Sequence, residues 1–206
     1  MTVRIKVCGI THPDDAAAAV DAGADLIGIN FVPGSPRRVE PRHAEAIAKR
    51  VEGQVERVAL FRDPSWDEVE RITRRIDFER VQLHGQESEA DVEMLDLPVI
   101  KAIRGADLEA AGQYPGALLL LDHPTEGGGR GKAWNWSDAR ELIAHGYDVI
   151  LAGGLTPENV GQALGDLGDL LPWGVDVATG VEGEGHRKDP SLLAAFVAAV
   201  RKAEQG

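Results

Sequence analysis

The sequence contains very little cysteine: Cys8 is the only one in 206 residues. A single thiol cannot form a disulfide within the chain, so the fold has to be held by packing and hydrogen bonding. The six histidines are scattered without a His-x-x-x-His pair, so the spacing typical of zinc ligands is missing. We therefore expect no metal site. Cys8 itself needs an explanation, because it stands where a β-rich run ends and a helix is about to start.

Long apolar runs and basic residues are also scarce. No stretch approaches the roughly 18 apolar residues that a membrane-spanning helix needs, and the start MTVRIKV lacks the apolar core of a signal peptide. Lysine and arginine number 22 against 34 acidic residues, which gives a net charge of -12. That charge repels nucleic acid and anionic lipid. We expect a cytoplasmic protein without nucleic-acid or membrane partners, acting as a monomer or a homodimer.

A nucleotide-binding loop is missing too, although GGGRGKA at 127–133 resembles one superficially. A Walker loop requires glycine at position 126, where Glu126 stands, and serine or threonine after Lys132, where Ala133 stands. We therefore do not expect this segment to bind a nucleotide.

Eight short β-rich runs are present, and segments with helical periodicity separate them. The runs lie at 4–10, 25–32, 55–61, 78–84, 98–103, 117–122, 148–154 and 173–180. Helix-start signals follow several of them, such as Thr11 as a candidate N-cap and Asp189 before Pro190. The fifth connection, RGADLEAAGQYPG, is short and rich in glycine, so we expect a short or irregular fifth helix there.

Eight alternations of strand and helix predict a parallel sheet covered by helices and closed into a compact (β/α)8 barrel. No shift in composition divides the chain, so residues 1–206 are expected to form one domain. An open doubly wound sheet is the alternative, but it would typically carry a dinucleotide fingerprint. In a barrel, the active site lies at the carboxyl ends of the strands.

Two reactive side chains end strands at that rim. Cys8 closes the first run, and alternation places Lys6 on the same face, where its ammonium would lower the pKa of the thiol. Asp122 follows four leucines in the sixth run, and partial burial there would favour the protonated carboxyl. A buried structural cysteine and a loop-capping aspartate are the alternative interpretations. As a pair, the two residues supply a base and an acid.

Other residues at the rim suit an anionic ligand. The turns AGGLTPENV and DVATGVE after the seventh and eighth runs expose backbone N–H groups where this fold usually binds phosphate. Arg37, on a loop stiffened by prolines, suits a carboxylate. His84 ends the fourth run and either contacts the ligand or serves the structure.

Together, KVCGIT, FVPGSPRRV, VQLHG, LLLLD, GGGRGKAWNW, LAGGLTPENV and GVDVATGVE…KD resemble the phosphoribosylanthranilate isomerase family, in order and across essentially the whole chain. The resemblance implies isomerisation of N-(5'-phosphoribosyl)anthranilate to 1-(o-carboxyphenylamino)-1-deoxyribulose 5-phosphate in tryptophan biosynthesis, without cofactor or metal. It makes Cys8 the general base, Asp122 the general acid and Arg37 the partner of the anthranilate carboxylate. The remaining substrate-binding residues that it implies are His84, Asp176 near the ribose hydroxyls, and Gly154, Ala178, Thr179 and Gly180 at the phosphate.

The sequence departs from the family pattern in two places. The usual Ser-Ser-Gly after the eighth strand reads Ala178, Thr179, Gly180, and the usual Phe-Asp-Trp reads Trp134, Asn135, Trp136. Arg130 and Lys132 lie in the loop after Asp122, where they either move with the substrate or are solvated. Two alternatives stay open at this point: the histidine-pathway isomerase that rearranges another phosphoribosyl amine, and a barrel that binds phosphate without catalysis.

Overall fold

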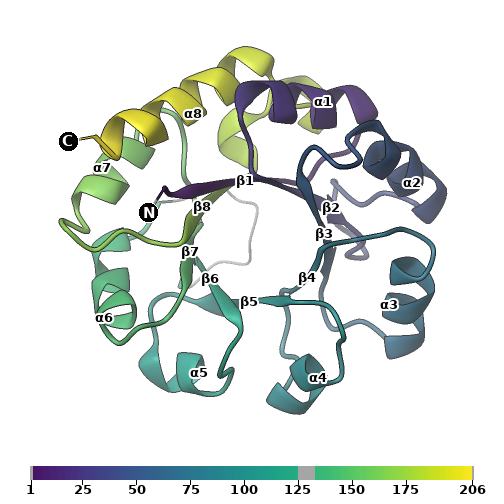
Figure 1. The fold of residues 1–206 in the computed structure, drawn as a ribbon, viewed down its shortest axis with the longest axis horizontal. Helices are drawn as coiled ribbons and strands as arrows, with labels where there is room; N and C mark the ends of the chain where they lie inside the picture. The colour runs from purple at the N-terminus through teal and green to yellow at the C-terminus, as the bar shows by residue number, and fades with distance from the viewer. Residues whose placement is uncertain (1, 125–132, 206) are drawn as a thin grey trace.

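Eight parallel strands form a closed barrel in the computed structural model, which describes residues 2–124 and 133–205. Each strand pairs with the next along the chain, and β8 pairs with β1 to close the ring (Figure 1). The strands are β1 (Arg4–Cys8), β2 (Leu26–Asn30), β3 (Glu56–Phe61), β4 (Arg80–Leu83), β5 (Val99–Arg104), β6 (Leu118–Asp122), β7 (Val149–Leu151) and β8 (Gly174–Val177). The predicted (β/α)8 barrel is confirmed, and the sheet is not an open one. Arg130 and Lys132 lie outside the described residues.

Helices surround the barrel in chain order (Figure 1). They are α1 (Pro13–Ala22), α2 (Pro41–Arg50), α3 (Trp66–Thr73), α4 (Glu89–Glu93), α5 (Leu108–Gly112), α6 (Ala139–Ala144), α7 (Val160–Gly165) and α8 (Pro190–Ala203), with 3-10 turns η1 (Trp136–Asp138), η2 (Thr179–Val181) and η3 (Glu184–His186). The expected short fifth helix is confirmed, because α5 has only five residues. Each described helix is too short or too polar to cross a lipid bilayer.

Of the two helix-start residues named above, Asp189 is confirmed as an N-cap and Thr11 is not. Asp189 caps α8 through hydrogen bonds from backbone N–H groups of the first turn, and Pro190 is the first helical residue, as predicted. Thr11 is not the N-cap of α1. His12 takes that position because Pro13 occupies the first helical position, and proline is favoured directly after a cap.

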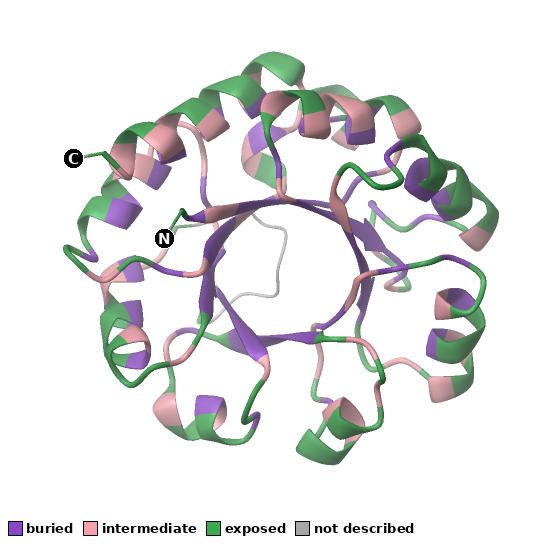
Figure 2. Cartoon of the chain, viewed as in Figure 1, coloured by how far each residue is buried: buried purple, intermediate pink, exposed green. Residues whose placement is uncertain are grey.

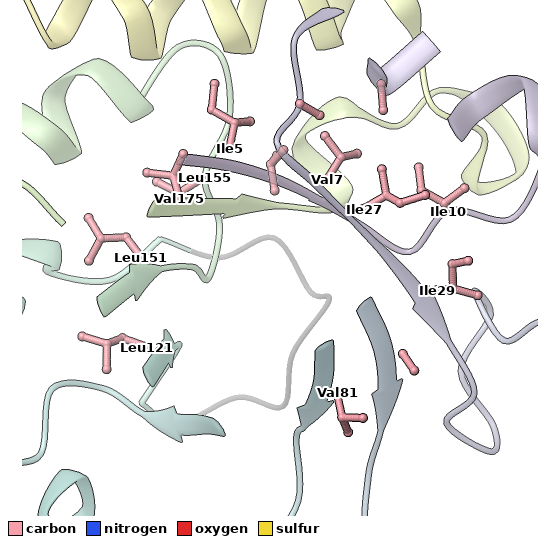
Figure 3. Close-up of a cluster of buried hydrophobic side chains, with 14 of the residues drawn as sticks. Ile5, Val7, Ile10, Ile27, Ile29, Val81, Leu121, Leu151, Leu155 and Val175 are labelled. Carbon is pink, nitrogen blue, oxygen red and sulfur yellow. The ribbon is translucent and has the colours of Figure 1, made fainter. Parts of the chain in front are cut away.

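Apolar side chains pack on both sides of the strand ring. On the outer side, a large cluster fills the space between strands and helices, and Ile5, Leu121 and Leu151 point outward in Figure 3. Figure 2 shows the buried residues concentrated on the strands and on the inward faces of the helices. Inside the barrel, a smaller cluster consists of Leu26, Val58, Ile100, Ala102, Leu118, Leu120, Ile150 and Ala152. This interior is a packed core and leaves room for a ligand only at its mouth.

The inner side of the barrel also carries polar residues toward the carboxyl ends of the strands. Lys6 and Gln82 are each 1% exposed. Because strand side chains alternate with a period of two, Cys8 and His84 lie two positions further along the same inner faces. The pleat of the strands therefore carries these side chains to the mouth of the barrel.

Candidate active site

A cavity of about 500 Å³ opens at the carboxyl ends of the strands, which is within the size range of small-ligand sites. All nine residues predicted from the sequence line it: Cys8, Arg37, His84, Asp122, Gly154, Asp176, Ala178, Thr179 and Gly180. They come from six different strand ends, which the closed barrel brings together. Their individual roles stay predictions.

Cys8 lies at the end of β1, 7% exposed, beside an ion pair. The ammonium of Lys6 is 2.6 Å from Oδ1 of Asp176, on the neighbouring strand β8. Gly28 on β2 leaves room for the thiol: a Cβ at that position would lie 2.9 Å from Cys8 Sγ and 3.3 Å from Lys6 Nζ. The glycine therefore keeps open the space that the thiol and the ammonium share.

Burial raises the pKa of the Cys8 thiol, and the nearby carboxylate of Asp176 adds to that effect. The ammonium groups of Lys6 and Lys188 lower it, but burial outweighs them. The sequence-based expectation that Lys6 lowers this pKa is thus correct for that one interaction and wrong for the total. The reason is that the barrel interior withdraws the thiol from water more strongly than a sequence pattern reveals.

A second group of buried charges adjoins the thiol, centred on Glu182. Its carboxylate accepts hydrogen bonds from Arg37 at 2.6 and 2.8 Å and from Lys188 at 2.9 Å. Burial alone would raise the pKa of Glu182, but Arg37, Lys188 and His186 lower it to about 2. For Lys188, burial has the larger effect and lowers the pKa of the ammonium.

Glu182 and Lys188 were not named as site residues from the sequence. The only signal for them was the motif GVDVATGVE and the nearby lysine, which did not reveal that both side chains turn back toward the barrel mouth. Lys188 also donates to the backbone carbonyl of Ala178 at 2.9 Å. Ala178 stands where the family usually has serine, and its backbone carbonyl therefore helps to hold the ammonium of Lys188.

Arg37 lies across the mouth and is 7% exposed. Its Nε and Nη2 donate to Glu182, and Nη2 also donates to Oγ1 of Thr179 at 3.0 Å. A Cβ on Gly9 would lie 2.4 Å from Arg37 Cδ, so glycine is required where the two meet. Among the described residues no hydrogen bond occupies Nη1 of Arg37, and this nitrogen is available to a ligand carboxylate.

Asp122 ends β6, and each of its two carboxyl oxygens has a hydrogen-bond partner. The backbone N–H of His123 donates to Oδ1 at 2.8 Å, and Nε2 of His84 is 3.1 Å from Oδ2. The other ring nitrogen of His84 is 3.0 Å from the side-chain amide nitrogen of Gln82. An added Cβ on Gly153 would lie 3.0 Å from Oδ1 of Asp122, so the β7 turn passes close to the carboxyl group.

The turns after β7 and β8 touch each other at one side of the cavity. A Cβ on Gly180 would lie 2.1 Å from the carbonyl oxygen of Leu155, so only glycine allows this approach. Asn159 shapes the β7 turn by donating to the carbonyl of Gly154 at 2.9 Å and accepting from the N–H of Thr156 at 2.7 Å. Gly154 has a φ of 80°, the left-handed region that suits glycine. The two turns form one concave wall lined by backbone.

The second departure from the family pattern lies beside this wall. Asn135 caps the 3-10 turn η1, where its side chain bonds Ser137 and Asp138. The indoles of Trp134 and Trp136 both donate to the carbonyl of Ala152, at 2.9 and 3.0 Å. These tryptophans therefore fix the end of β7, and Asn135 itself serves the local turn.

Among the described residues, no group of three or more His, Cys, Asp or Glu side chains is arranged to hold a metal ion.

Comparison with known proteins points to one family. The family model described as N-(5'phosphoribosyl)anthranilate (PRA) isomerase matches residues 5–199. The chain is 42% identical to N-(5'-phosphoribosyl)anthranilate isomerase of Neisseria gonorrhoeae, with 97% of each chain covered. It is 43% identical to the enzyme of the same name from Pseudomonas fluorescens, with 98% of each covered.

Solved structures point to the same family. Phosphoribosyl anthranilate isomerase from Thermus thermophilus superposes with a TM-score of 0.87 at 37% identity, covering 97% of this chain and 99% of that one. A phosphoribosyl anthranilate isomerase in complex with reduced 1-(o-carboxyphenylamino)-1-deoxyribulose 5-phosphate has a TM-score of 0.84 at 30% identity, covering 98% and 100%.

Proposed function

Because the chain belongs to the N-(5'-phosphoribosyl)anthranilate isomerase family, we propose a division of roles in the reaction of that family, with Cys8 as general base and Asp122 as general acid. The reaction is the Amadori rearrangement of N-(5'-phosphoribosyl)anthranilate to 1-(o-carboxyphenylamino)-1-deoxyribulose 5-phosphate, a step of tryptophan biosynthesis. The observation that carries the proposal is the presence of both groups on one cavity, beside an arginine and a backbone-lined wall.

The acid acts first. Opening the ribose ring requires a proton on the ring oxygen, while the amine nitrogen supplies the electron pair that forms the C1'=N bond as the C1'–O bond breaks. Asp122 gives this proton and becomes a carboxylate. The backbone N–H of His123 already donates to one oxygen of that carboxylate, and the ring of His84 lies 3.1 Å from the other.

The base acts second. Cys8 takes the proton from C2' as a thiolate, and the electrons of the C–H bond form the enolamine. The enolamine becomes the ketone of the product when the 2'-hydroxyl loses its proton and C1' gains one. Return of the remaining proton from Cys8 to Asp122, by way of solvent, restores both groups.

The charges near the thiol favour its ionisation, although burial opposes it. Three cations and two carboxylates form the ion pairs next to Cys8: Lys6, Lys188, Arg37, Asp176 and Glu182. With their usual charges they leave one excess positive charge, which a thiolate neutralises. This count supports Cys8 as a base that forms its thiolate within the site.

Both anionic groups of the substrate have suitable partners on the wall of the cavity. The anthranilate carboxylate suits Nη1 of Arg37, and the phosphate suits the N–H groups of the turns at Gly154 and Gly180, with Thr179 beside them. Asp176 and His84 line the same cavity and suit the ribose hydroxyls. For the oligomeric state, monomer and homodimer both stay open. A Thermotoga maritima relative is described as dimeric and as converted to monomers.

The histidine-pathway isomerase is the second candidate considered from the sequence, and no observation favours it. Its site resembles a pair of carboxylates, whereas β1 here ends in Cys8. A barrel that only binds phosphate would not need the acid, the base and the arginine together.

An assay of the purified protein tests the function. Rearrangement changes the fluorescence of the anthranilate group, so turnover of phosphoribosylanthranilate is followed directly, and the histidine-pathway substrate is offered in parallel. We expect turnover of the first substrate only. Turnover of the second alone, or of neither at any enzyme concentration, would overturn the assignment.

A further inference from the structure

We propose that Gln82 is a positioning residue for the acid: its amide fixes the ring of His84 in the tautomer that donates a hydrogen bond to Asp122. The inference rests on the proposed role of Asp122 as general acid. It concerns a residue that acts through His84 and that the sequence did not single out.

The first observation is the burial of Gln82 between apolar strand neighbours. Its register partners are Leu60 on β3 and Ile100 on β5, and its side chain, at the floor of the cavity, is 1% exposed. Its Oε1 is the one buried side-chain oxygen or nitrogen atom, among the described residues, that has no hydrogen-bond partner. A buried polar atom without a partner destabilises a fold, typically by about 1–3 kcal/mol. Leucine or methionine would fill this position without that penalty.

The second observation is the direction of the hydrogen bonds. The amide nitrogen of Gln82 can only donate, so Nδ1 of His84, 3.0 Å away, accepts and carries no proton. In the neutral ring the proton is then on Nε2, which lies 3.1 Å from Oδ2 of Asp122. The amide of Gln82 therefore turns His84 into a donor toward the acid.

Other contacts fix the backbone of His84 and leave its tautomer undetermined. The N–H of His84 donates to the carbonyl of Phe61 at 2.9 Å. The next residue, Gly85, donates its N–H to Glu87, which is paired with the buried ammonium of Lys101 at 2.9 Å. Among the described residues, Gln82 is the sole hydrogen-bond partner of Nδ1.

A donor at Nε2 matters more after proton transfer than before it. When Asp122 gives up its proton, Oδ2 becomes part of a carboxylate and its hydrogen bond from His84 becomes stronger. An interaction that strengthens toward the transition state affects kcat more than KM. Support of this donor explains why a glutamine with an unpaired buried oxygen occupies the position.

The test is a double-mutant cycle between Gln82→Met and His84→Asn, with Gln162→Met on the exposed face of α7 as the matched control. We expect Gln82→Met to lower kcat on the order of 10-fold, the scale of one lost supporting hydrogen bond, with KM within about 2-fold. In the His84→Asn background, Gln82→Met should have no further effect. The control should keep wild-type kcat.

Two further measurements separate positioning from a structural role. Gln82→Met should unfold at a temperature equal to or above that of the wild type, because it removes an unpaired buried oxygen; a purely structural glutamine would lower it. In the wild-type protein, the ¹⁵N resonances of the His84 ring should show Nδ1 unprotonated and Nε2 protonated. In Gln82→Glu, the carboxylate accepts a hydrogen bond from Nδ1, so the proton should move to Nδ1 or both ring nitrogens should become protonated.

The inference fails if Gln82→Met keeps wild-type kcat, if the two substitutions act additively, or if the wild-type ring carries its proton on Nδ1. If Gln82→Met does not fold, the ring resonances of the wild type decide the question alone. Failure of the proposed function would be recognised by different results. The wild-type protein would lack isomerase activity, or the Asp122→Asn variant would keep full turnover.

Discussion

Arg37 and Glu182 form a bidentate ion pair inside the mouth of the barrel, with N–O distances of 2.6 and 2.8 Å. The arginine proposed to bind the substrate carboxylate is therefore already held in place by a carboxylate of the protein. Such a clamp fixes the guanidinium before the substrate arrives, which lowers the entropy lost on binding.

Replacing Arg37 by alanine should raise KM more than it lowers kcat. The anthranilate carboxylate does not react, so it is held similarly in the ground state and the transition state. Loss of one charge-assisted hydrogen bond corresponds to about 1.5–3 kcal/mol, or roughly 10- to 150-fold in binding. Steady-state kinetics measures both constants. Arg38→Ala, at an arginine that is 40% exposed, is the control and should leave them unchanged. If only Arg38→Ala raises KM, the neighbouring arginine is the anchor.

The ion pairs of Glu182 should make the protein sensitive to acid. The pKa of Glu182 is about 2 in the fold against an ordinary 4.5. A lowered carboxyl pKa stabilises the fold above the ordinary value, and this stabilisation is lost as the pH falls from about 4.5 toward 2. The free energy of unfolding, measured by urea titration, should drop more steeply in that range for the wild type than for Glu182→Gln. The exposed Glu93→Gln serves as control, and equal slopes for Glu182→Gln and the wild type would contradict the prediction.

A methyl group at Gly28 should disturb the base without harming the rest of the fold. It would lie 2.9 Å from Cys8 Sγ, closer than a Cβ and a sulfur tolerate, so the thiol has to move. Misplacement of a reacting group by about 1 Å can slow a reaction on the order of 100-fold. We expect Gly28→Ala to lower kcat by at least 10-fold. Gly161→Ala, on α7 where a Cβ meets nothing within 4 Å, should keep kcat and stabilise the protein slightly. A Gly28→Ala enzyme with normal kcat would show that the thiol needs no fixed position.

Inorganic phosphate should bind the turns after β7 and β8 and compete with substrate. Backbone N–H groups are expected to bind the phosphate, so mutation of nearby side chains should lower its affinity only slightly. Amide chemical shifts on phosphate titration should therefore change first at Gly154 and Gly180. Perturbations confined to other residues would remove the assignment.

Much of the fold was predictable because each strand of a parallel barrel is a short apolar run between helix signals. LLLLD at 118–122 predicts both a buried strand and an aspartate at its end, and β6 has those bounds. The start of α1 was misplaced by one residue, because threonine is the commoner capping residue, whereas Pro13 at the first helical position makes His12 the cap.

The site was predictable where a residue ends a strand, as Cys8 and Asp122 do. It was not predictable where a side chain folds back from a later turn. Glu182 reaches Arg37, 145 positions away in sequence, and no local pattern encodes that pairing. Gln82 was not predictable for another reason. A single polar residue in a strand normally faces solvent, and only the structure shows that Gln82 is buried with an unpaired side-chain oxygen.

The central claim is that Cys8 and Asp122 each carry one proton transfer. A single acid or base typically contributes about 10² to 10⁴-fold, so Asp122→Asn should lower kcat by at least about 100-fold with little change in KM. Asparagine keeps the shape and a hydrogen bond but cannot release a proton to the ring oxygen, so it separates acidity from geometry.

The most direct measurement is the kcat of Cys8→Ala, with Cys8→Ser beside it. The account predicts a loss of at least about 100-fold for alanine at nearly unchanged KM, and a loss almost as large for serine, because an alkoxide is far less accessible than a thiolate at neutral pH. A Cys8→Ala enzyme that turns over phosphoribosylanthranilate at close to the wild-type rate would contradict the account, reduce the thiol to packing, and move the base to His84 or Asp176.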